Sequence, residues 1–367
     1  MREKVVVGMS GGVDSSVAAY LLKEKGYDVI GVTMQIWQDE TEIFQEEHGG
    51  CCGLSAADDA RRVAAVLGIP HYVMNFKHEF KSFVRDYFAK EYYAGRTPNP
   101  CIACNRYVKW ESLLQKAEGL GADKLATGHY AGLITLPNGR LSVKTATIGA
   151  KDQTYALYNL TQEQLIKTLF PVGEYTKPQI REIAEKAGLP VAHKPDSQDI
   201  CFVNDGDYAG YLEKETGLKL PEGNFINPKG EILGRHKGII HYTVGQRKGL
   251  GLALPKPGYV LEIRPETNEV VIGTKEDSLK KAIKATNISL MAANEIKDGT
   301  RVIAKIRYNH KGAPAVIFRT GEDEITCVFD EKVSSPAPGQ ALVLYKSINE
   351  ENTADSDLYV FGGGTIK

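Results

Sequence analysis

The sequence lacks the features that mark membrane, secreted and repetitive proteins. No apolar run approaches the roughly 20 residues of a membrane-spanning helix. The first residues lead into a predicted strand without the apolar segment of a secretory signal. We find no internal repeat and no low-complexity segment. We therefore expect a globular, cytoplasmic protein with no membrane partner.

A strong excess of charge is absent as well. The 45 Lys and Arg residues nearly balance the 46 Asp and Glu residues, which leaves a formal net charge of −1. The overall charge neither indicates nor excludes a nucleic acid partner, because local basic patches would bind one. Six cysteines in 367 residues, several in short clusters, argue against a disulfide scaffold and favour redox or metal chemistry in a reducing compartment.

The order of predicted elements indicates three domains. From about residue 4 to 128, short apolar strands alternate with amphipathic helices, which predicts an α/β fold with a doubly wound, mostly parallel sheet. We expect this domain to cover residues 1–205. A small, basic central domain follows at 206–278, and a C-terminal β-barrel, with a sandwich as the alternative, at 279–367. Gly8, Met34 and Gly128 fall at predicted strand ends, where such sheets bind ligands.

A glycine-rich loop follows the first predicted strand. Glycines let backbone N–H groups approach a ligand closely, and the N-terminus of the next helix favours an anion. The helix is expected to begin near Ser15, with Ser15 and Ser16 as caps. Since the lysine of a Walker loop is absent, the usual kinase or GTPase phosphate loop does not fit. The loop reads Ser10-Gly11-Gly12-Val13-Asp14-Ser15-Ser16.

This string resembles the PP-loop of the ATP pyrophosphatases. The resemblance implies an adenine nucleotide alpha hydrolase-like fold, cleavage of ATP between its α and β phosphates, and Mg²⁺ held with the help of Asp14. The alternative is a plain glycine turn between a strand and a helix.

Three cysteines lie in predicted loops. Cys101 and Cys104 form a C-x-x-C pair just before a helix expected from about Arg106 to Glu118, and Cys201 follows a polar stretch. The helix dipole, together with nearby Arg106 and Lys109, is expected to lower the pKa of the Cys104 thiol from its usual value of about 8.5. Loop thiols in an ATP-using enzyme indicate sulfur transfer. Structural zinc and simple packing are the alternatives.

Six ordered motifs extend the pattern along the chain. They read GMSGGVDSS at 8–16, GRTPNP at 95–100 followed by Cys104-Asn105, ATGHY at 126–130, KDQTY at 151–155, DSQDICF at 196–202 and YTVGQRKGLG at 242–251. Together they resemble the tRNA-specific 2-thiouridylase family over essentially the whole length. The glycine loop alone would identify only the superfamily.

This resemblance implies a reaction. ATP adenylates C2 of the wobble uridine in the tRNA anticodon, and sulfur transfer then gives 2-thiouridine, AMP and pyrophosphate. Cys201 matches the cysteine that carries a persulfide, and Cys104 its partner nucleophile. The sulfur donor would be a persulfide relay protein, a cysteine desulfurase or hydrosulfide. Either the persulfide attacks C2 or Cys104 first releases hydrosulfide, and both routes end in a Cys104–Cys201 disulfide.

The resemblance also implies binding residues. The ATP site comprises Gly8, Met9, Ser10, Gly11, Gly12, Val13, Asp14, Ser15, Ser16, Met34 and Gly128. Contacts to the tRNA or its target base comprise Asn99, Pro100, Cys101, His129, Lys151, Asp152, Gln153, Arg307, Tyr308 and Gln340. Basic clusters near residues 235–237, 247–248 and 305–311 support an RNA partner.

One position departs from the family pattern. The best-known members carry Asp where this chain has Cys101, so a carboxylate is lost and a third candidate thiolate is gained. Cys101, Cys104 and Cys201 could hold a [4Fe-4S] cluster with one open iron, as in related tRNA thiolases. Zinc fits the same ligands. We expect Cys51, Cys52 and Cys327 to serve packing. A PP-loop ligase for small molecules and a non-catalytic RNA-binding scaffold stay open as alternative functions.

Overall fold

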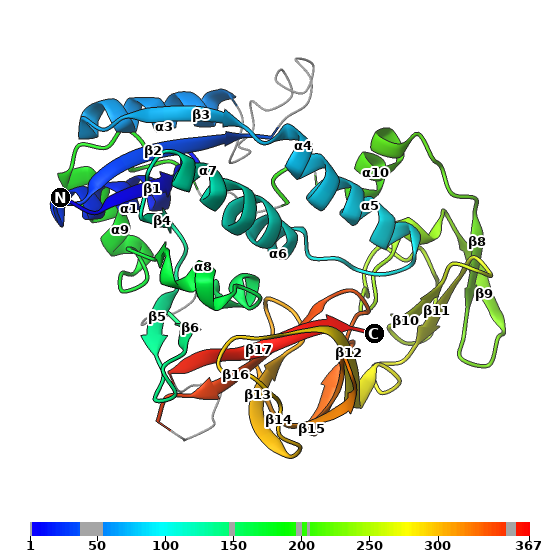
Figure 1. The fold of residues 1–367 in the computed structure, drawn as a ribbon. Coiled ribbons are helices and arrows are strands. Elements are labelled where there is room, and N and C mark those ends of the chain that lie inside the picture. Colours follow the sequence, from blue (N-terminus) through cyan, green and yellow to red (C-terminus); the bar gives the residue numbers. More distant parts are fainter. Residues whose placement is uncertain (1, 37–53, 147–150, 196–199, 204–205, 350–356) are drawn as a thin grey trace. The chain divides into compact units, whose positions relative to one another are not determined.

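The computed structural model describes residues 2–36, 54–146, 151–195, 200–203, 206–349 and 357–367 (Figure 1). The chain forms two compact units. Unit 1 comprises Met1–Val84 and Cys101–Gly206, and unit 2 comprises Arg85–Pro100 and Asp207–Lys367. Within the described ranges, every helix is too short or too polar to cross a membrane.

Unit 1 contains a parallel sheet of five strands. The strands are β1 (Lys4–Gly8), β2 (Asp28–Gln35), β3 (His71–Asn75), β4 (Lys124–Thr127) and β7 (Thr168–Leu169), in the order β3-β2-β1-β4-β7. The chain runs outward from β1 to β3 and then returns to the other side of β1 as β4. The carboxyl ends of β1 and β4 therefore flank a topological switch point, where sheets of this kind bind ligands. The predicted doubly wound sheet is confirmed.

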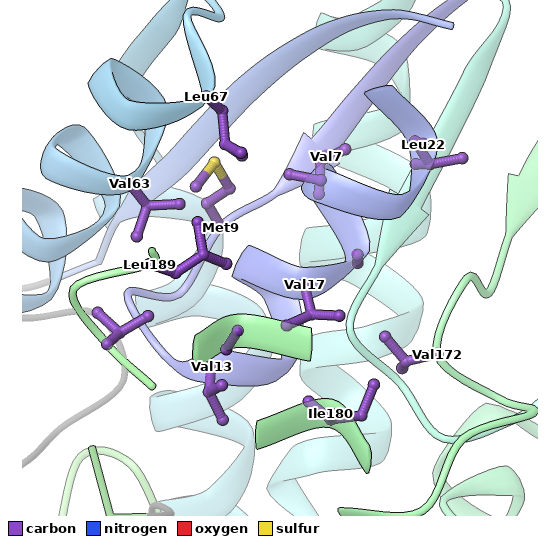
Figure 2. Close-up of a cluster of buried hydrophobic side chains, with 14 of the residues drawn as sticks. Val7, Met9, Val13, Val17, Leu22, Val63, Leu67, Val172, Ile180 and Leu189 are labelled. Atoms are coloured by element: carbon purple, nitrogen blue, oxygen red, sulfur yellow. The ribbon is translucent and has the colours of Figure 1, made fainter. Parts of the chain in front are cut away.

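Helices α1 (Val13–Glu24), α3 (Leu54–Leu67) and α9 (Lys177–Lys186) bury their apolar faces in one cluster with β1. Figure 2 shows Val7, Val17, Val63 and Ile180 pointing into this cluster. Local sequence explains where α1 ends and where α9 begins. Gly26 adopts the left-handed conformation just after α1, and Thr176 forms a capping box with Gln179 at the start of α9.

Two further helical stretches of the chain contain π-helical turns. The first runs through α4 (Lys77–Phe80), η1 (Lys81–Arg85) and α5 (Asp86–Tyr93). The second runs through α6 (Pro100–Ala103), η2 (Cys104–Leu113) and α7 (Leu114–Gly119). It begins six residues earlier than the helix predicted from Arg106, so the prediction of a loop around Cys101 and Cys104 was wrong. Proline suits the first helical position, because its φ is already helical and its missing N–H needs no partner there.

Shorter elements complete unit 1. β5 (Gly132–Thr135) pairs with β6 (Leu141–Lys144) in an antiparallel hairpin. Between them and β7 lie η3 (Thr154–Leu157) and α8 (Gln162–Ile166). The Trp110 indole is fully buried and donates a 2.7 Å hydrogen bond to the Thr168 hydroxyl. This bond fixes η2 against β7, the edge strand of the parallel sheet.

Unit 2 contains two β structures. Helix α10 (Tyr208–Thr216) precedes a small sheet of β8 (Gly223–Ile226), β9 (Ile232–His236), β10 (Tyr259–Arg264) and β11 (Glu269–Gly273), in the order β10-β11-β8-β9. A short η4 (Ile239–His241) follows β9. Phe225, Val260 and Val270 are fully buried in the core of this sheet.

The C-terminal strands close into a barrel. They are β12 (Leu279–Leu290), β13 (Thr300–Lys305), β14 (Ala313–Gly321), β15 (Glu324–Ser334), β16 (Ala341–Ser347) and β17 (Leu358–Ile366). Antiparallel pairing runs in the order β12-β15-β14-β13-β16-β17, and β12 pairs with β17 to complete the ring. The predicted barrel is confirmed over the sandwich alternative.

Candidate functional site

A cavity of about 290 Å³ lies at the carboxyl ends of β1 and β4 in unit 1. It is therefore at the topological switch point of the sheet. The glycine-rich loop, the start of α1 and the residues after β4 form its walls. The predicted ATP residues that line it are Gly8, Met9, Ser10, Gly12, Val13, Asp14, Ser15, Met34 and Gly128.

Close packing requires glycine at two positions beside this cavity. Gly11 has φ +67°, and a Cβ there would lie 2.3 Å from the Ala56 carbonyl oxygen. A Cβ on Gly128 would lie 2.6 Å from the backbone nitrogen of Ser15. The end of β4 can therefore approach the first turn of α1 only because residue 128 has no side chain.

The start of α1 differs from the prediction in its capping. The helix begins at Val13, its N-cap residue is Gly12, and no side chain caps it. The Ser15 and Ser16 hydroxyls instead donate to the Gly12 carbonyl oxygen at 3.1 and 2.9 Å, because both serines lie inside the helix. The prediction that these serines cap the helix was wrong. A helix N-terminus with no side-chain cap favours a bound anion at its backbone amides.

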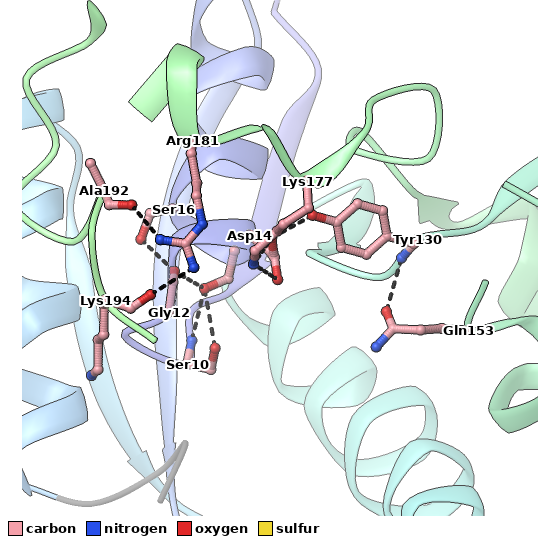
Figure 3. Close-up of polar contacts among 11 residues, drawn as sticks. Ser10, Gly12, Asp14, Ser16, Tyr130, Gln153, Lys177, Arg181, Ala192 and Lys194 are labelled. Atoms are coloured by element: carbon pink, nitrogen blue, oxygen red, sulfur yellow. Dashed lines mark hydrogen bonds and ion pairs between the residues drawn. The ribbon is translucent and has the colours of Figure 1, made fainter. Parts of the chain in front are cut away.

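Asp14 is the centre of a polar network (Figure 3). The Lys177 ammonium donates to both carboxylate oxygens at 2.7 and 2.9 Å, and the Tyr130 hydroxyl donates to Oδ1 at 2.6 Å. The backbone of Tyr130 is itself held by Gln153, whose side-chain oxygen accepts its N–H at 2.9 Å. Arg181, one turn after Lys177, donates to the carbonyl oxygens of residues 192 and 194.

The cavity suits an anionic ligand with one metal ion. Among the described residues that line it, Asp14 is the single carboxylate, while Lys109, Lys151 and Lys194 supply positive charge. Polyphosphate would be neutralised by the lysines and the helix N-terminus. Mg²⁺ commonly takes one or two protein carboxylates together with phosphate oxygens, and Asp14 fits that role. Its carboxylate must then be shared with, or released by, Lys177.

Three predicted RNA contacts of unit 1 also line the cavity, namely His129, Lys151 and Gln153. Asp152 does not, and its Oδ2 accepts a 2.8 Å hydrogen bond from the Thr154 hydroxyl. His129 is half-buried, with its Nδ1 2.8 Å from the Thr127 hydroxyl. Burial, together with the nearby positive charge of Lys109, holds the pKa of His129 well below its usual range. The imidazole is therefore neutral at physiological pH.

The cysteines differ in exposure. Cys101, in the first turn of α6, is exposed, and Cys104, which begins the second turn, is partly buried. Cys201 is also partly buried. Cys327 is buried in β15, where burial raises the pKa of its thiol to about 12, so the predicted packing role is confirmed. Cys51 and Cys52 lie outside the described residues.

The structure does not bring Cys101, Cys104 and Cys201 together as the ligands of a metal cluster. Across the described residues, which include Cys101, Cys104 and Cys201, no group of three His, Cys, Asp or Glu side chains is placed to hold a metal ion. The thiols of Cys101, Cys104 and Cys201 therefore do not fit a [4Fe-4S] cluster or a zinc site.

The predicted RNA contacts of unit 2 fall in two environments. Arg307 and Tyr308 are exposed and follow β13, with Arg307 donating to the Ser334 carbonyl oxygen at 3.1 Å. Gln340 is partly buried, and its side-chain amide donates to the carbonyl oxygens of Thr97 and Pro98 at 3.1 and 3.4 Å. Gln340 therefore contacts the segment that leads into Asn99 and Pro100.

Several side chains of the site were not predicted. Tyr130 ends a motif noted in the sequence, but its contact with Asp14 depends on the fold. Lys177 lies 163 positions from Asp14, so no local signal could connect them. Lys109 was noted only for its charge near Cys104, and Lys194, which pairs with Asp59 at 2.6 Å, carried no sequence signal. The roles of all four side chains became evident only from the fold, which brings distant segments of unit 1 together at the cavity.

Family models match nearly the whole chain. Residues 3–205 match the tRNA methyl transferase HUP domain, residues 209–274 the tRNA methyl transferase PRC-barrel domain, and residues 280–366 the aminomethyltransferase beta-barrel domain.

Curated relatives match at full length. The chain is 65% identical over 364 residues to a tRNA-specific 2-thiouridylase MnmA of Lachnoclostridium phytofermentans, covering 99% of each chain. It is 52% identical over 368 residues to the protein of the same name from Clostridioides difficile, covering 100% of this chain and 99% of the relative.

Solved structures show weaker likeness. A 4-thiouridine synthetase–RNA complex with bound ATP matches 59% of this chain and 50% of its own, with a TM-score of 0.34 and 18% identity. An NMN synthetase from Francisella tularensis matches 59% of this chain and 73% of its own, with a TM-score of 0.34 and 17% identity.

Proposed function

Because this chain belongs to the tRNA-specific 2-thiouridylase family, we propose that it is a sulfurtransferase that replaces the C2 oxygen of the wobble uridine of tRNA with sulfur. The observation that carries the proposal is the uncapped N-terminus of α1 at the switch-point cavity, with lysines around it and the accessible thiols of Cys101, Cys104 and Cys201 in the same unit. Such a cavity suits ATP, and such thiols suit sulfur transfer.

The first step is activation of the uridine. Oxygen at C2 is a poor leaving group, and attachment of AMP to it makes its departure feasible. The backbone amides at the start of α1 would hold the pyrophosphate that leaves, and Lys109 and Lys194 would balance its charge. Asp14 would hold Mg²⁺, which neutralises phosphate charge when it is bound.

The second step is sulfur transfer. The terminal sulfur of a Cys201 persulfide attacks C2, and AMP leaves with the former C2 oxygen. The Cys104 thiolate then attacks the Cys201 sulfur, so that the S–S bond to the uridine breaks and its electron pair stays on the 2-thio group. In the other order, Cys104 first releases hydrosulfide, which attacks C2. Both orders leave a Cys104–Cys201 disulfide that a thiol reductant must reduce.

The remaining assignments are part of the same proposal. Asn99, Pro100 and Cys101 contact the target base, which must leave its stack to be reached. Contacts to the rest of the anticodon region come from His129, Lys151, Asp152, Gln153, Arg307, Tyr308 and Gln340. The sulfur donor is a persulfide relay protein, a cysteine desulfurase or hydrosulfide. We also propose that the enzyme acts in the cytoplasm, because the reaction needs tRNA and reduced thiols. The proposed domain boundaries are 1–205, 206–278 and 279–367.

The cavity argues against methyl transfer, which the family-model descriptions name. A sulfonium methyl donor carries positive charge at its reacting centre, and three lysines line the cavity against one carboxylate. A polyphosphate suits that balance better. A small-molecule ligase would adenylate without tRNA, and a scaffold would not adenylate at all.

The test measures ATP–pyrophosphate exchange with and without unmodified tRNA. We expect exchange that requires tRNA and that persists in Cys201→Ser, because adenylation precedes sulfur transfer. Thiolation should be lost in Cys201→Ser and Cys104→Ser. Exchange without tRNA would indicate a ligase for small molecules.

A second measurement separates the two sulfur routes. After anaerobic purification and incubation with a persulfide donor, the persulfide route predicts the mass of one added sulfur on the Cys201 peptide and no iron. About four iron and four sulfide per chain, lost together in Cys101→Ala, would instead establish a [4Fe-4S] route.

A further inference from the structure

An aromatic stack joins the two π-helical segments of unit 1. Phe83 of η1 and Tyr107 of η2 stack with ring centroids 5.0 Å apart and planes 21° from parallel. The Arg106 guanidinium carbon lies 5.0 Å from the centre of the Tyr107 ring. π-Helical turns are rare and occur frequently at functional sites. Here η1 carries Phe83, and η2 carries Tyr107 and Arg106.

The outer ring of this stack faces solvent. Phe83 is 41% exposed, although Phe80 and Val84 on the same helical stretch are buried. The Arg106 side chain is 43% exposed, and its 3.9 Å approach to Glu111 is a weak, solvent-screened ion pair. Lys81, two residues before Phe83, is also exposed. The stack therefore presents an exposed aromatic ring, with the Arg106 guanidinium beside its second ring.

Both cysteines assigned to sulfur transfer lie on segments that carry or contact the helices of the stack. Cys104 precedes Tyr107 by three residues on η2, which places it about one turn away on the same helix. Cys201 is next to Phe202, whose ring packs edge-on against Phe80, with centroids 5.7 Å apart. Phe80 is itself three residues before Phe83. Segments carrying both thiols thus flank the stack.

We propose that Phe83, Tyr107 and Arg106 form a stacking platform for an unpaired nucleobase of the tRNA anticodon loop beside the wobble uridine. This inference rests on the proposed function. Proteins bind single-stranded RNA by stacking bases on aromatic rings and Arg planes, with basic side chains near the phosphates. When the uridine is turned out of its stack, its neighbour loses a stacking partner. The Phe83 ring supplies a replacement.

The test uses an anticodon stem-loop RNA with 2-aminopurine on the 3′ side of the wobble uridine. Stacking quenches the fluorescence of 2-aminopurine. We expect Phe83→Ala to abolish the quenching and to weaken RNA binding about 10-fold, while Phe83→Trp retains both. Tyr72→Ala is the matched control, because Tyr72 is an aromatic residue 48% exposed on β3 of the same unit.

Quenching and affinity within two-fold of the parent in Phe83→Ala would overturn the platform. If Phe83→Ala instead slows the loading of a persulfide onto Cys201 from a cysteine desulfurase while RNA binding stays intact, the platform is also overturned. The aromatic surface would then bind a protein partner. Pyrophosphate affinity should stay unchanged in every variant, which checks that unit 1 is folded. If the parent protein binds no RNA and shows no tRNA-dependent exchange, the proposed function itself fails.

Discussion

Replacing Lys177 with Met should destabilise unit 1, because it leaves the Asp14 carboxylate without its ion-pair partner. Lys177 donates to both oxygens of Asp14 at 2.7 and 2.9 Å, and the two side chains are only 14% and 29% exposed. The substitution keeps an unbranched side chain of similar length, so packing around α9 is largely retained. The main change is the loss of one positive charge.

The free energy of unfolding that Lys177→Met should remove lies between two limits. Exposed ion pairs contribute about 0–1 kcal/mol, and removal of one partner from a fully buried pair costs about 3–5 kcal/mol. Asp14 keeps the hydrogen bond from Tyr130 and the favourable N-terminus of α1. We therefore expect a loss of about 2 kcal/mol. For a unit of this size that lowers Tm by about 4–8 °C.

Fluorescence-detected unfolding measures this loss. Trp110 is fully buried in unit 1, so its fluorescence follows the unfolding of that unit, and the other tryptophan of the sequence, Trp37, lies outside the described residues. Lys186→Met is the matched control on the same helix, because the 74% exposed Lys186 pairs with Glu182 and should cost less than about 0.5 kcal/mol.

A double-mutant cycle with Asp14→Asn isolates the pair. We expect a coupling energy of about 1–2 kcal/mol between the two substitutions. The reasoning is refuted if Lys177→Met costs no more than the Lys186 control, or if the effects of Lys177→Met and Asp14→Asn simply add.

Three further predictions concern other parts of the chain. Gln340→Ala should speed hydrogen exchange at the Thr97 amide several-fold, because the donor that holds the adjoining carbonyls is lost. Replacing Arg307 and Lys311 with Ala should weaken tRNA binding and flatten its dependence on salt, as titration at several salt concentrations will show. His129 is neutral when folded and titrates at a higher pH when unfolded, so its contribution to stability is lost as pH falls below about 6.5. His129→Gln should therefore reduce the loss of Tm between pH 7 and pH 5.

Local signals predicted the parallel sheet and its glycine loop well. Strand ends at Gly8 and Thr127 follow from short apolar runs, and Gly11 is needed for a positive φ against Ala56. The serine caps failed because serine inside the first turns of a helix donates back to a carbonyl as readily as it caps. The prediction of a loop around Cys101 was wrong, because the helix already begins at Pro100. Asn99-Pro100 is a typical helix start, so the local sequence did carry this signal.

Contacts between distant segments could not be predicted. Nothing near Asp14 in sequence indicates that Lys177 will pair with it, since α1 and α9 meet only through the shared core. The same holds for closure of the barrel, which depends on β12 pairing with β17. These pairs are decided by which apolar faces are buried together, and single-sequence patterns do not encode that choice locally.

Segment 85–100 shows why sequence boundaries and physical units differ. It lies within the predicted N-terminal domain, yet the Thr97 N–H donates to the Pro338 carbonyl oxygen at 2.7 Å. A Cβ on Gly95 would lie 2.9 Å from the Pro265 ring, which indicates close packing there. A chain ending at residue 205 would lose both contacts. Asn99 and Pro100, the last two residues of this segment, thus belong to the unit that carries Arg307. The target-base contacts that we propose for them would therefore depend on C-terminal residues that an ATP-binding domain alone would not need.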